Sequence, residues 1–422
     1  YLIVNPLGFN RRELVEVPKS FIKNSNGSNQ DINDSTVLAL VDIPSAGYTM
    51  NTNFLVTENT VSLTNNNNGF NIKNKWINVD IDITGQITSL IWISTGKQII
   101  EQGKRGNHFI MFDDNPLFWD AWDVDVYHLE KRFEFHNEAQ ITNEIIENGP
   151  LRVSIQFTIP ISKESSIIQT IRITSESQLI EFDNIVDWNE SHKFLKVEFP
   201  TTIRSQQCTY EIPYGWVQRP THYNTSWDLA RFEVCGHRFA DLAEYNFGVS
   251  LLNDCKYGYS TKDSKMTLSL LRSPKAPDET ADMGKHEFKF AFYPHENSFQ
   301  DAKVVQAGLR FNNPVVLHSI SNSLNDSINF SFAHIDCSAI IIDQIKLAED
   351  SNDIIIRMYE SYGGSHTKCT IQLGASPSKV SIVNLLEEEI ESNNDISIIN
   401  SNSFILSFKP FEIITVKITV DE

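Results

Sequence analysis

The richest group of residues that could do chemistry lies in the run FDDNPLFWDAWDVDVYHLE, which extends from Phe112 to Glu130. Six carboxylates and two tryptophans stand close together there. The best candidates to touch a ligand are Trp119, Asp120, Trp122, Asp123 and Asp125. Carboxylates accept hydrogen bonds from sugar hydroxyls, and aromatic faces stack on the apolar faces of pyranose rings. The run therefore predicts a glycan-binding edge. The alternative is an acidic loop that its tryptophans pack onto a core.

The same carboxylates could include the acid and the nucleophile of a glycosidase, because such enzymes use two carboxyl groups that flank the bond to be cut. What defines that pair is the separation of the two groups across the substrate, and positions along the chain do not give it. The sequence leaves this assignment open.

A second polar run extends over residues 213–259. His222, His237 and Asp241 in this run are of the types that bind metals. They lack HExxH or any other compact ligand spacing. We favour the alternative that they are buried polar residues which fix long loops between strands.

A third run, LLRSPKAPDETADMGKHEF, begins where a predicted strand ends at Arg272. Two prolines then break regular structure, because the residue before a proline avoids the helical region. A rigid, charged surface loop is expected. Arg272 and Lys275 could donate hydrogen bonds to sugar hydroxyls or to a neighbouring acidic domain. An ion-paired loop at a domain interface is the alternative.

The elements that must position these runs follow from a repeat of two residues. Apolar and polar residues alternate over 77–83, 180–187, 404–408 and 414–420. Such alternation is typical of half-buried strands. The sequence shows no long amphipathic helix pattern. Residues 385–391 are the best candidate for a helical turn, with a solvated loop as the alternative. We therefore predict an all-β fold made of sandwiches.

Polar, Asn-rich breaks at 24–35, 65–69 and 312–314 suggest how the chain is divided. The three expected parts are a small β unit over residues 1–60, a large central sandwich over 61–312 and a terminal immunoglobulin-like sandwich over 313–422.

The 422 residues include 54 acidic and 35 basic side chains, which gives a net charge of −19. This balance argues against a nucleic-acid partner, which would need clustered Lys and Arg, and against adsorption to anionic membranes. No apolar run is long enough to span a bilayer. The chain begins at Tyr1, already inside a strand-like run, so we expect a segment of a longer protein.

The five cysteines are scattered and none forms a CxxC pair. Their odd number and wide spacing favour free, buried thiols over a disulfide framework, and this indicates cytosolic synthesis. Cys235 and Cys255 have apolar, strand-like surroundings without a local base. We predict that both are buried, inert thiols rather than nucleophiles.

Taken together, these runs resemble glycoside hydrolase family 38, in its branch of cytosolic and vacuolar α-mannosidases. The resemblance extends over nearly the whole chain and also rests on HKFLKVEFP at 192–200 and the closing MYESYGG and KPFEIITVKI. It implies an enzyme that hydrolyses terminal, non-reducing α-D-mannose residues of oligosaccharides with retention. An aspartate nucleophile, a second carboxylate and a zinc ion held by His and Asp ligands would do the chemistry.

In that family the zinc ligands and the catalytic carboxylates belong to an N-terminal catalytic domain and the helical region after it. The resemblance places this chain after that part, so we assign it no catalytic residue and no metal ligand. It implies a galactose-mutarotase-like super-sandwich that packs against the catalytic domain and reaches the rim of its sugar pocket. On that basis the rim candidates are Trp119, Asp120, Trp122, Asp123, Asp125, Asp254 and Arg272.

The segment alone is therefore expected to be inactive. Its expected partners are mannose-containing oligosaccharides and the catalytic domain of the same enzyme, and a homo-oligomer stays open. The compartment is cytoplasmic or vacuolar/lysosomal. An independent carbohydrate-binding or interaction module is the alternative, and a stand-alone epimerase would need a His and carboxylate pair that we cannot assign. The segments 354–364 and 409–416 look architectural, and we assign no chemistry to them.

Overall fold

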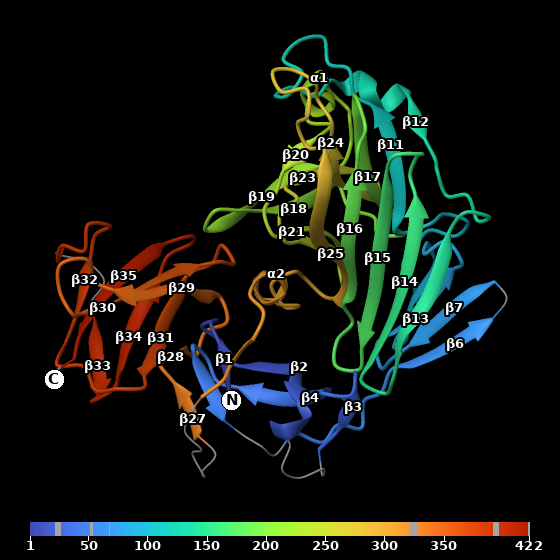
Figure 1. Ribbon diagram of the computed structural model, residues 1–422. Helices are drawn as coiled ribbons and strands as arrows, with labels where there is room; N and C mark the ends of the chain where they lie inside the picture. Colours follow the sequence, from blue (N-terminus) through green and yellow to red (C-terminus); the bar gives the residue numbers. More distant parts are fainter. Residues whose placement is uncertain (22–26, 51–53, 67, 321–327, 391–395, 421–422) are drawn as a thin grey trace. The chain divides into compact units, whose positions relative to one another are not determined.

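The computed structural model describes residues 1–21, 27–50, 54–66, 68–320, 328–390 and 396–420. Strands make up most of the described chain, and its helices are short (Figure 1). The predicted all-β class is confirmed. The chain divides into two compact units. The central unit comprises Glu58–Glu211 and Val217–Val304, and the terminal unit comprises Tyr1–Thr57, Ile212–Trp216 and Val305–Glu422.

Three sheets build the central unit. The nine-stranded sheet has the order β13-β14-β15-β16-β25-β22-β21-β18-β19. Its strands are β13 (Thr142–Asn148), β14 (Arg152–Pro160), β15 (Ser166–Thr174), β16 (Ile180–Trp188), β18 (Gln207–Ile212), β19 (Gly215–Pro220), β21 (Phe239–Glu244), β22 (Phe247–Asn253) and β25 (Gly284–Glu296).

The six-stranded sheet has the order β12-β11-β17-β24-β23-β20, and the five-stranded sheet has the order β10-β9-β8-β7-β6. The strands of the six-stranded sheet are β11 (His108–Asp113), β12 (Arg132–Phe133), β17 (Lys193–Pro200), β20 (Val234–Cys235), β23 (Gly258–Lys262) and β24 (Lys265–Arg272). Those of the five-stranded sheet are β6 (Ser62–Asn66), β7 (Gly69–Lys73), β8 (Ile77–Asp82), β9 (Ile87–Trp92) and β10 (Lys97–Gln98). The helical turns of this unit are the 3₁₀ turn η2 (Val126–Glu130) and the short helix α1 (Ser226–Leu229).

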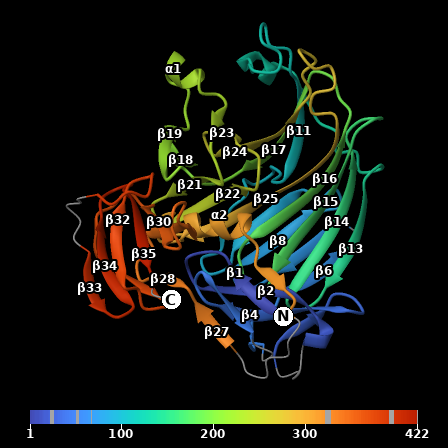
Figure 2. The same cartoon turned by 60° about the vertical axis from the view of Figure 1, so that its left-hand side comes forward.

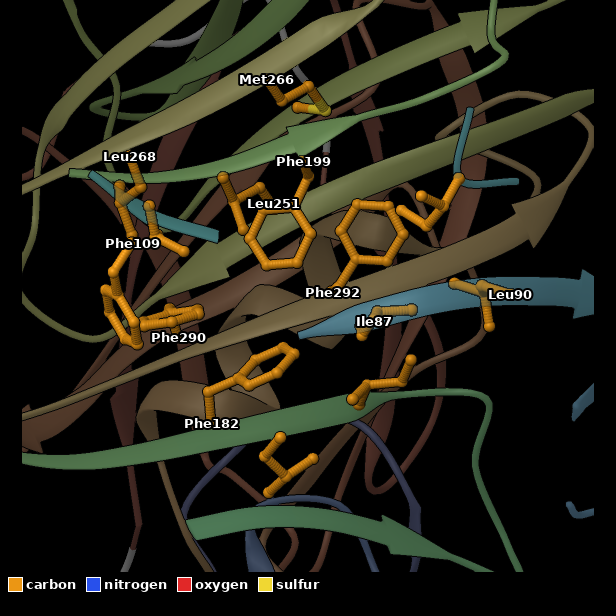
Figure 3. Packing of buried hydrophobic residues seen from close by; sticks show 14 of the residues in the cluster. Ile87, Leu90, Phe109, Phe182, Phe199, Leu251, Met266, Leu268, Phe290 and Phe292 are labelled. Carbon is orange, nitrogen blue, oxygen red and sulfur yellow. The ribbon is translucent and has the colours of Figure 1, made fainter. Parts of the chain in front are cut away.

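Stacked phenylalanines join the sheets of the central unit across one continuous core (Figure 3). Phe199 of β17 stacks on Phe292 of β25, with ring centroids 4.8 Å apart. Within the nine-stranded sheet, Phe182 of β16 stacks on Phe290 of β25 at 4.9 Å, and Phe290 also meets Phe199 edge to face at 6.3 Å. All four side chains are fully buried, and burying an aromatic ring contributes about 2 kcal/mol or more by the area removed from water. This core makes a rigid base for the loops at the strand ends.

The terminal unit begins with small sheets and ends with a sandwich. The sheets have the orders β2-β4-β3 and β26-β1-β5-β27, and the sandwich faces are β28-β31-β34-β33 and β29-β30-β35-β32. The small-sheet strands are β1 (Leu2–Asn5), β2 (Arg11–Pro18), β3 (Asn29–Asp31), β4 (Thr36–Ile43), β5 (Gly47–Met50), β26 (Val316–His318) and β27 (Ile328–Ser331). The sandwich strands are β28 (Ala333–Ile335), β29 (Ile340–Leu347), β30 (Ile354–Glu360), β31 (His366–Leu373), β32 (Lys379–Val383), β33 (Ser397–Asn400), β34 (Ser403–Phe408) and β35 (Ile413–Thr419). The 3₁₀ turn η1 (Lys19–Phe21) and the helix α2 (Val304–Asn312) complete the elements.

The alternating stretches of the sequence form strands as predicted, in β8, β16, β34 and β35. Residues 385–390 form a loop rather than a helical turn, and residue 391 of that prediction lies outside the described residues. The Asn-rich stretch 24–35, which the sequence marks as a polar break, contains the short strand β3, because its residues 29–31 pair with β4. Its residues 24–26 lie outside the described part of the chain.

The expected division into parts at residues 60 and 312 stays a prediction. The first and last stretches of the chain share one compact unit, because β1 pairs with β26 and β5 pairs with β27. Among the helices that the structure describes, none combines the length and apolarity that crossing a bilayer requires.

Candidate functional site

Two loops of the central unit meet at the end of β24. The first, residues 114–131, follows β11, and the second, residues 273–283, follows β24. They lie side by side at one end of this unit, in teal and gold (Figures 1 and 2). Strands β11 and β24 both pair with β17. The sheet order thus brings together the first and third runs of the sequence.

Arg272, the last residue of β24, ties the first loop down. Its Nε donates to Oδ2 of Asp114 at 2.6 Å, and its Nη2 donates to the backbone carbonyls of Asp120 at 3.0 Å and Asp123 at 2.7 Å. The Asp114 carboxylate is almost fully buried. Burial raises its pKa, and the facing guanidinium opposes this only in part. Arg272 therefore donates its hydrogen bonds within the protein, to the buried Asp114 carboxylate and to two backbone carbonyls of the first loop.

Asp120 joins the first loop to the second. Its Oδ2 accepts hydrogen bonds from the backbone N–H groups of Lys275 at 2.6 Å and Ala276 at 3.0 Å, and lies 3.4 Å from Nε2 of His192. Burial raises the pKa of Asp120, but the two N–H groups and His192 outweigh burial, so the net pKa is lower than usual. The ionised Asp120 carboxylate thus links the first loop to the second through these hydrogen bonds.

Two other members of the candidate set have different surroundings. Asp125 turns inward, and its Oδ2 accepts from the backbone N–H of Leu117 at 2.8 Å. The Asp123 carboxylate is exposed, and within the described part of the chain no partner is recorded for it. Lys275 donates from Nζ to the carbonyl of Glu279 at 3.0 Å, inside its own loop. Among the three candidate aspartates of this loop, Asp120, Asp123 and Asp125, Asp123 is the one for which the described residues offer no partner.

The tip of the first loop is apolar and exposed. Trp119 and Trp122 are 66% and 67% exposed, and their rings meet edge to face at 6.1 Å. Leu117 and Phe118 beside them are each 74% exposed. The expected alternative, tryptophans packed onto a core, is wrong, because the loop holds itself together through Asp114, Asp120 and Asp125 instead. We call Leu117, Phe118, Trp119 and Trp122 the apolar tip.

A buried cation that sequence reasoning missed lies beneath the first loop. Lys196 of β17 is 2% exposed, and its Nζ donates to Oε2 of Glu233 at 2.6 Å and to Nε2 of His128 at 3.1 Å. The same Nζ lies 4.3 Å from the ring centroid of Phe194. The side chains of β17 alternate between its two faces, so the sequence pattern alone places Lys196 on a solvent face.

His128 connects this cation to η2. Its Nδ1 lies 2.7 Å from the carbonyl of Asp125, and burial, followed by the charge of Lys196, lowers the pKa of His128 to about 4. The neutral imidazole therefore carries its proton on Nδ1 and accepts from Lys196 on Nε2. Lys196 and His128 hold the base of the loop, while Arg272 holds its middle.

Asp254 stands apart from this group. Its Oδ2 accepts from the backbone N–H of Lys289 at 3.0 Å, in the turn between β22 and β23. Its Oδ1 is buried, and among the described residues it has no hydrogen-bond partner. The structure records no contact between Asp254 and the other six candidates in the described ranges. The seven rim residues stay a prediction; five of them lie in the first loop, and Arg272 at the end of β24 contacts that loop.

The family model described as "Glycosyl hydrolases family 38 C-terminal domain" matches residues 72–280. A second, "Glycosyl hydrolases family 38 C-terminal beta sandwich domain", matches residues 339–416. The chain belongs to glycosyl hydrolase family 38. All seven rim candidates fall within the first match.

Several curated relatives of this family 38 chain are named α-mannosidases. Human "Alpha-mannosidase 2C1" is 40% identical over 98% of the chain, and "Alpha-mannosidase G" of Dictyostelium discoideum is 44% identical over 82%. The chain spans 39% of the human protein and 32% of the Dictyostelium protein. The crystal structure of an α-mannosidase from Enterococcus faecalis shares the fold, with a TM-score of 0.70 and 15% identity over 99% of this chain and 55% of that one.

The family resemblance implies a zinc ion, and the described residues of this chain do not fit one. Within the described ranges, no group of three or more His, Cys, Asp or Glu side chains could hold a metal. The metal-type residues of the second run have separate partners. His222 lies 3.5 Å from Asp228, whereas Asp241 accepts from His295 at 2.7 Å and from Ser250 at 2.7 Å. Asp241 is a buried polar residue, as the favoured alternative expected.

The cysteine prediction was partly wrong. None of the five cysteines forms a disulfide, and Cys208 and Cys369 are buried. Cys235 and Cys255, however, are exposed, because the first lies in a two-residue edge strand and the second in a turn after β22. Partial burial and the neighbouring Asp254 raise the pKa of Cys255 to about 11. Its low thiolate fraction makes it a poor nucleophile in spite of its exposure.

Proposed function

We propose that this family 38 chain is part of an α-mannosidase that hydrolyses terminal, non-reducing α-D-mannose residues with retention. Residues outside the chain would supply the acid/base and the nucleophile. The observation that carries the proposal is the similarity to human α-mannosidase 2C1 over 98% of the chain. Because the chain spans 39% of that protein, the activity of the whole enzyme belongs to the proposal.

The two loops at the end of β24 would border the sugar site. Arg272, Asp114 and Asp120 hold the apolar tip in place without using its aromatic rings. Exposed apolar patches of this kind mark interaction surfaces. The tip would pack against the catalytic part of the enzyme and leave Asp123 at the edge of the pocket. The chain would thus complete and stabilise the enzyme rather than perform its chemistry.

The zinc ion belongs to the same proposal, with ligands outside the chain, and no step is assigned to it here. Mannose-containing oligosaccharides are the proposed substrates. The compartment, cytoplasmic or vacuolar/lysosomal, stays a prediction from the family resemblance, and a homo-oligomer stays open.

A second candidate function is an independent carbohydrate-binding module. The observation that favours it is the edge-to-face pair of Trp119 and Trp122, because exposed aromatic rings can stack on sugars. In this case the chain would bind mannose oligosaccharides without any partner domain.

Hydrolysis of an aryl α-mannoside separates the two functions. We expect no hydrolysis by the isolated chain, with or without added zinc, and hydrolysis by a longer protein that contains it. Zinc-dependent turnover by the isolated chain would contradict our account of where the chemistry lies. Calorimetric binding of a mannose oligosaccharide to the isolated chain, abolished by Trp122→Ala, would support the second function instead.

A further inference from the structure

Two cysteines face each other in the terminal sandwich. The register of β28 against β31 pairs Ala333 with Leu373 and Ile335 with Ile371. Two residues further on, the same register sets Cys337 opposite Cys369. Cys337 packs against the buried cluster that contains Cys369. The strand order thus brings together two of the five cysteines that are 32 positions apart in the sequence.

The hydrogen-bond pattern shows what kind of pair this is. The backbone N–H of Asp336 donates to the carbonyl of Thr370, and the backbone N–H of Thr370 donates to Oδ1 of Asp336. The bond from Asp336 N–H continues the register one residue past the end of β28. Cys337 and Cys369 fall at the next position, which is a non-hydrogen-bonded pair in a regular antiparallel ladder. The Cα atoms of such pairs lie about 4.5 Å apart. Disulfides span Cα separations of about 4.4–6.8 Å, so a bond between the two sulfurs fits the backbone.

A β-bulge adds a histidine to the pair. His366 pairs with Phe408 and Cys369 with Leu406, so β31 has one extra residue between them. Lys368 in this bulge has a φ of 60°. Residues three apart on a regular strand face opposite sides, and the extra residue puts His366 on the same side as Cys369. Nδ1 of His366 accordingly lies 3.7 Å from Sγ of Cys337.

A buried carboxylate orients that histidine. Nε2 of His366 is buried and lies 3.2 Å from Oε1 of Glu360, a charge contact rather than an aligned hydrogen bond. The Glu360 side chain is fully buried and accepts hydrogen bonds from the backbone N–H groups of Tyr362, Gly363 and Phe411. A carboxylate held in this way favours the tautomer with its proton on Nε2. Nδ1 is then free to accept a proton from Cys337.

We propose that Cys337, Cys369, His366 and Glu360 form a peroxide-sensitive site at which Cys337 and Cys369 join in a reversible disulfide between β28 and β31. Glu360 of this site lies in segment 354–364, to which the sequence analysis assigned no chemistry. It does not depend on the proposed mannosidase function.

The two thiols take different roles. Cys337 is partly exposed, whereas Cys369 is buried and burial raises its pKa to about 12. His366 takes the proton of Cys337, and the thiolate attacks one oxygen of hydrogen peroxide. The O–O bond breaks, a sulfenic acid forms on Cys337, and the departing hydroxide leaves as water with the proton from His366. Cys369 then reacts as the thiol, because the sulfenic sulfur is held beside it: the S–S bond forms, the S–O bond breaks, and the departing hydroxide takes the proton of Cys369 and leaves as a second water. Two thiols are oxidised and one peroxide is reduced to two waters.

The direct test needs no variant. The reduced, purified protein is treated with hydrogen peroxide, its remaining thiols are alkylated, and its peptides are mapped by mass spectrometry. We expect a linked peptide that joins Cys337 to Cys369 and disappears on treatment with dithiothreitol. Cys235 is the matched control, because it is exposed and stays a monothiol in the same map. A disulfide that includes Cys235 or Cys255 would overturn the proposal. Oxidation of Cys337 to sulfinic acid without formation of the Cys337–Cys369 disulfide would overturn it as well.

The role of His366 is tested by rate. His366→Asn removes the proton acceptor, and we expect the linked peptide to form roughly a hundredfold more slowly at pH 7. Raising the pH should reduce this difference, because the Cys337 thiolate then forms without help. Circular dichroism checks that the variant is folded. A folded variant with an unchanged rate and an unchanged pH profile would show that His366 plays no part in the step.

Discussion

Nε of Arg272 donates a hydrogen bond of 2.6 Å to the carboxylate of Asp114, which lies 158 residues earlier in the chain. The carboxylate is 1% exposed, and its other oxygen has no partner among the described residues. Nη2 of Arg272 donates hydrogen bonds to the backbone carbonyls of Asp120 and Asp123 in the first loop. One cation thus neutralises a buried charge and fixes the loop that presents the apolar tip.

Arg272→Ala should lower the free energy of unfolding by about 3 kcal/mol, because truncation leaves the Asp114 charge buried without its partner. Arg357→Ala is the matched control. The hydrogen bonds of Arg357 to Thr415 and Gln344 are both 3.4 Å long, so we expect a loss below about 0.5 kcal/mol. Urea unfolding of both variants measures the difference. In the longer enzyme, Arg272→Ala should also lower kcat/KM more than Arg357→Ala does.

A double variant separates the charge effect from lost packing. Adding Asp114→Leu to Arg272→Ala removes the unpaired carboxylate, so part of the lost stability should return. If the double variant is less stable than Arg272→Ala alone, the loop is held by packing and the ion pair is not what fixes it.

Lys196→Met should destabilise the central unit by about 3 kcal/mol, because it leaves the Glu233 carboxylate without its cation in a poorly hydrated site, with the Ser269 hydroxyl as its remaining donor. The Lys196 side chain is 2% exposed and that of Glu233 is 15% exposed. Lys131→Met is a suitable control, since the Lys131 side chain is 72% exposed and surface ion pairs contribute little. Chemical denaturation of the two variants tests this, and equal stabilities would show that Lys196 is not a structural cation.

Much of the fold follows from the sequence because strand periodicity is local. The alternation over 77–83 and 414–420 depends on which side of one strand is buried, and β8 and β35 confirm it. The pairing of the first and last stretches of the chain, through β1 with β26, is set by tertiary packing. The composition of the first stretch does not indicate that it pairs with the last stretch, so the sequence alone could not predict this pairing.

The sequence could predict which residues belong to the candidate site, but it could not predict what each side chain contacts there. The first and third runs were both singled out, and the structure brings Asp120 and Arg272 together. The sequence could not show that Arg272 faces a buried Asp114. Lys196 was missed because its alternation predicts a solvated side chain, whereas η2 and the segment around Glu233 cover it.

Acid should weaken the protein through His128. Burial lowers its folded-state pKa from 6.5 to about 4, so the unfolded chain takes up a proton first as the pH falls. The stability linked to His128 is complete above pH 6.5 and is lost as the pH falls toward about 4. His136 adds to this loss, because burial lowers its pKa to about 3. His128→Asn should therefore flatten, without abolishing, the fall in urea midpoint between pH 7 and pH 5.

An exposed histidine provides the control for that measurement. His318→Asn alters a solvent-facing side chain of β26 and should leave the pH dependence as in the unsubstituted protein. A fall in midpoint that is equally steep in His128→Asn and in the unsubstituted protein would mean that His128 is already charged in the folded state.

Trp122→Ala tests whether the apolar tip serves function rather than stability. Trp122 is 67% exposed, so the isolated chain should lose less than about 0.5 kcal/mol of stability. If the tip packs on the catalytic part of the enzyme or borders its sugar, the same change should lower kcat/KM of the longer protein on an aryl α-mannoside about tenfold or more. Trp227→Ala on α1 is the matched control, because Trp227 is 77% exposed and belongs to no loop that Arg272 holds. Equal kinetics for the two variants would remove the tip from the proposed interface, whereas a loss confined to Trp122→Ala would place it there.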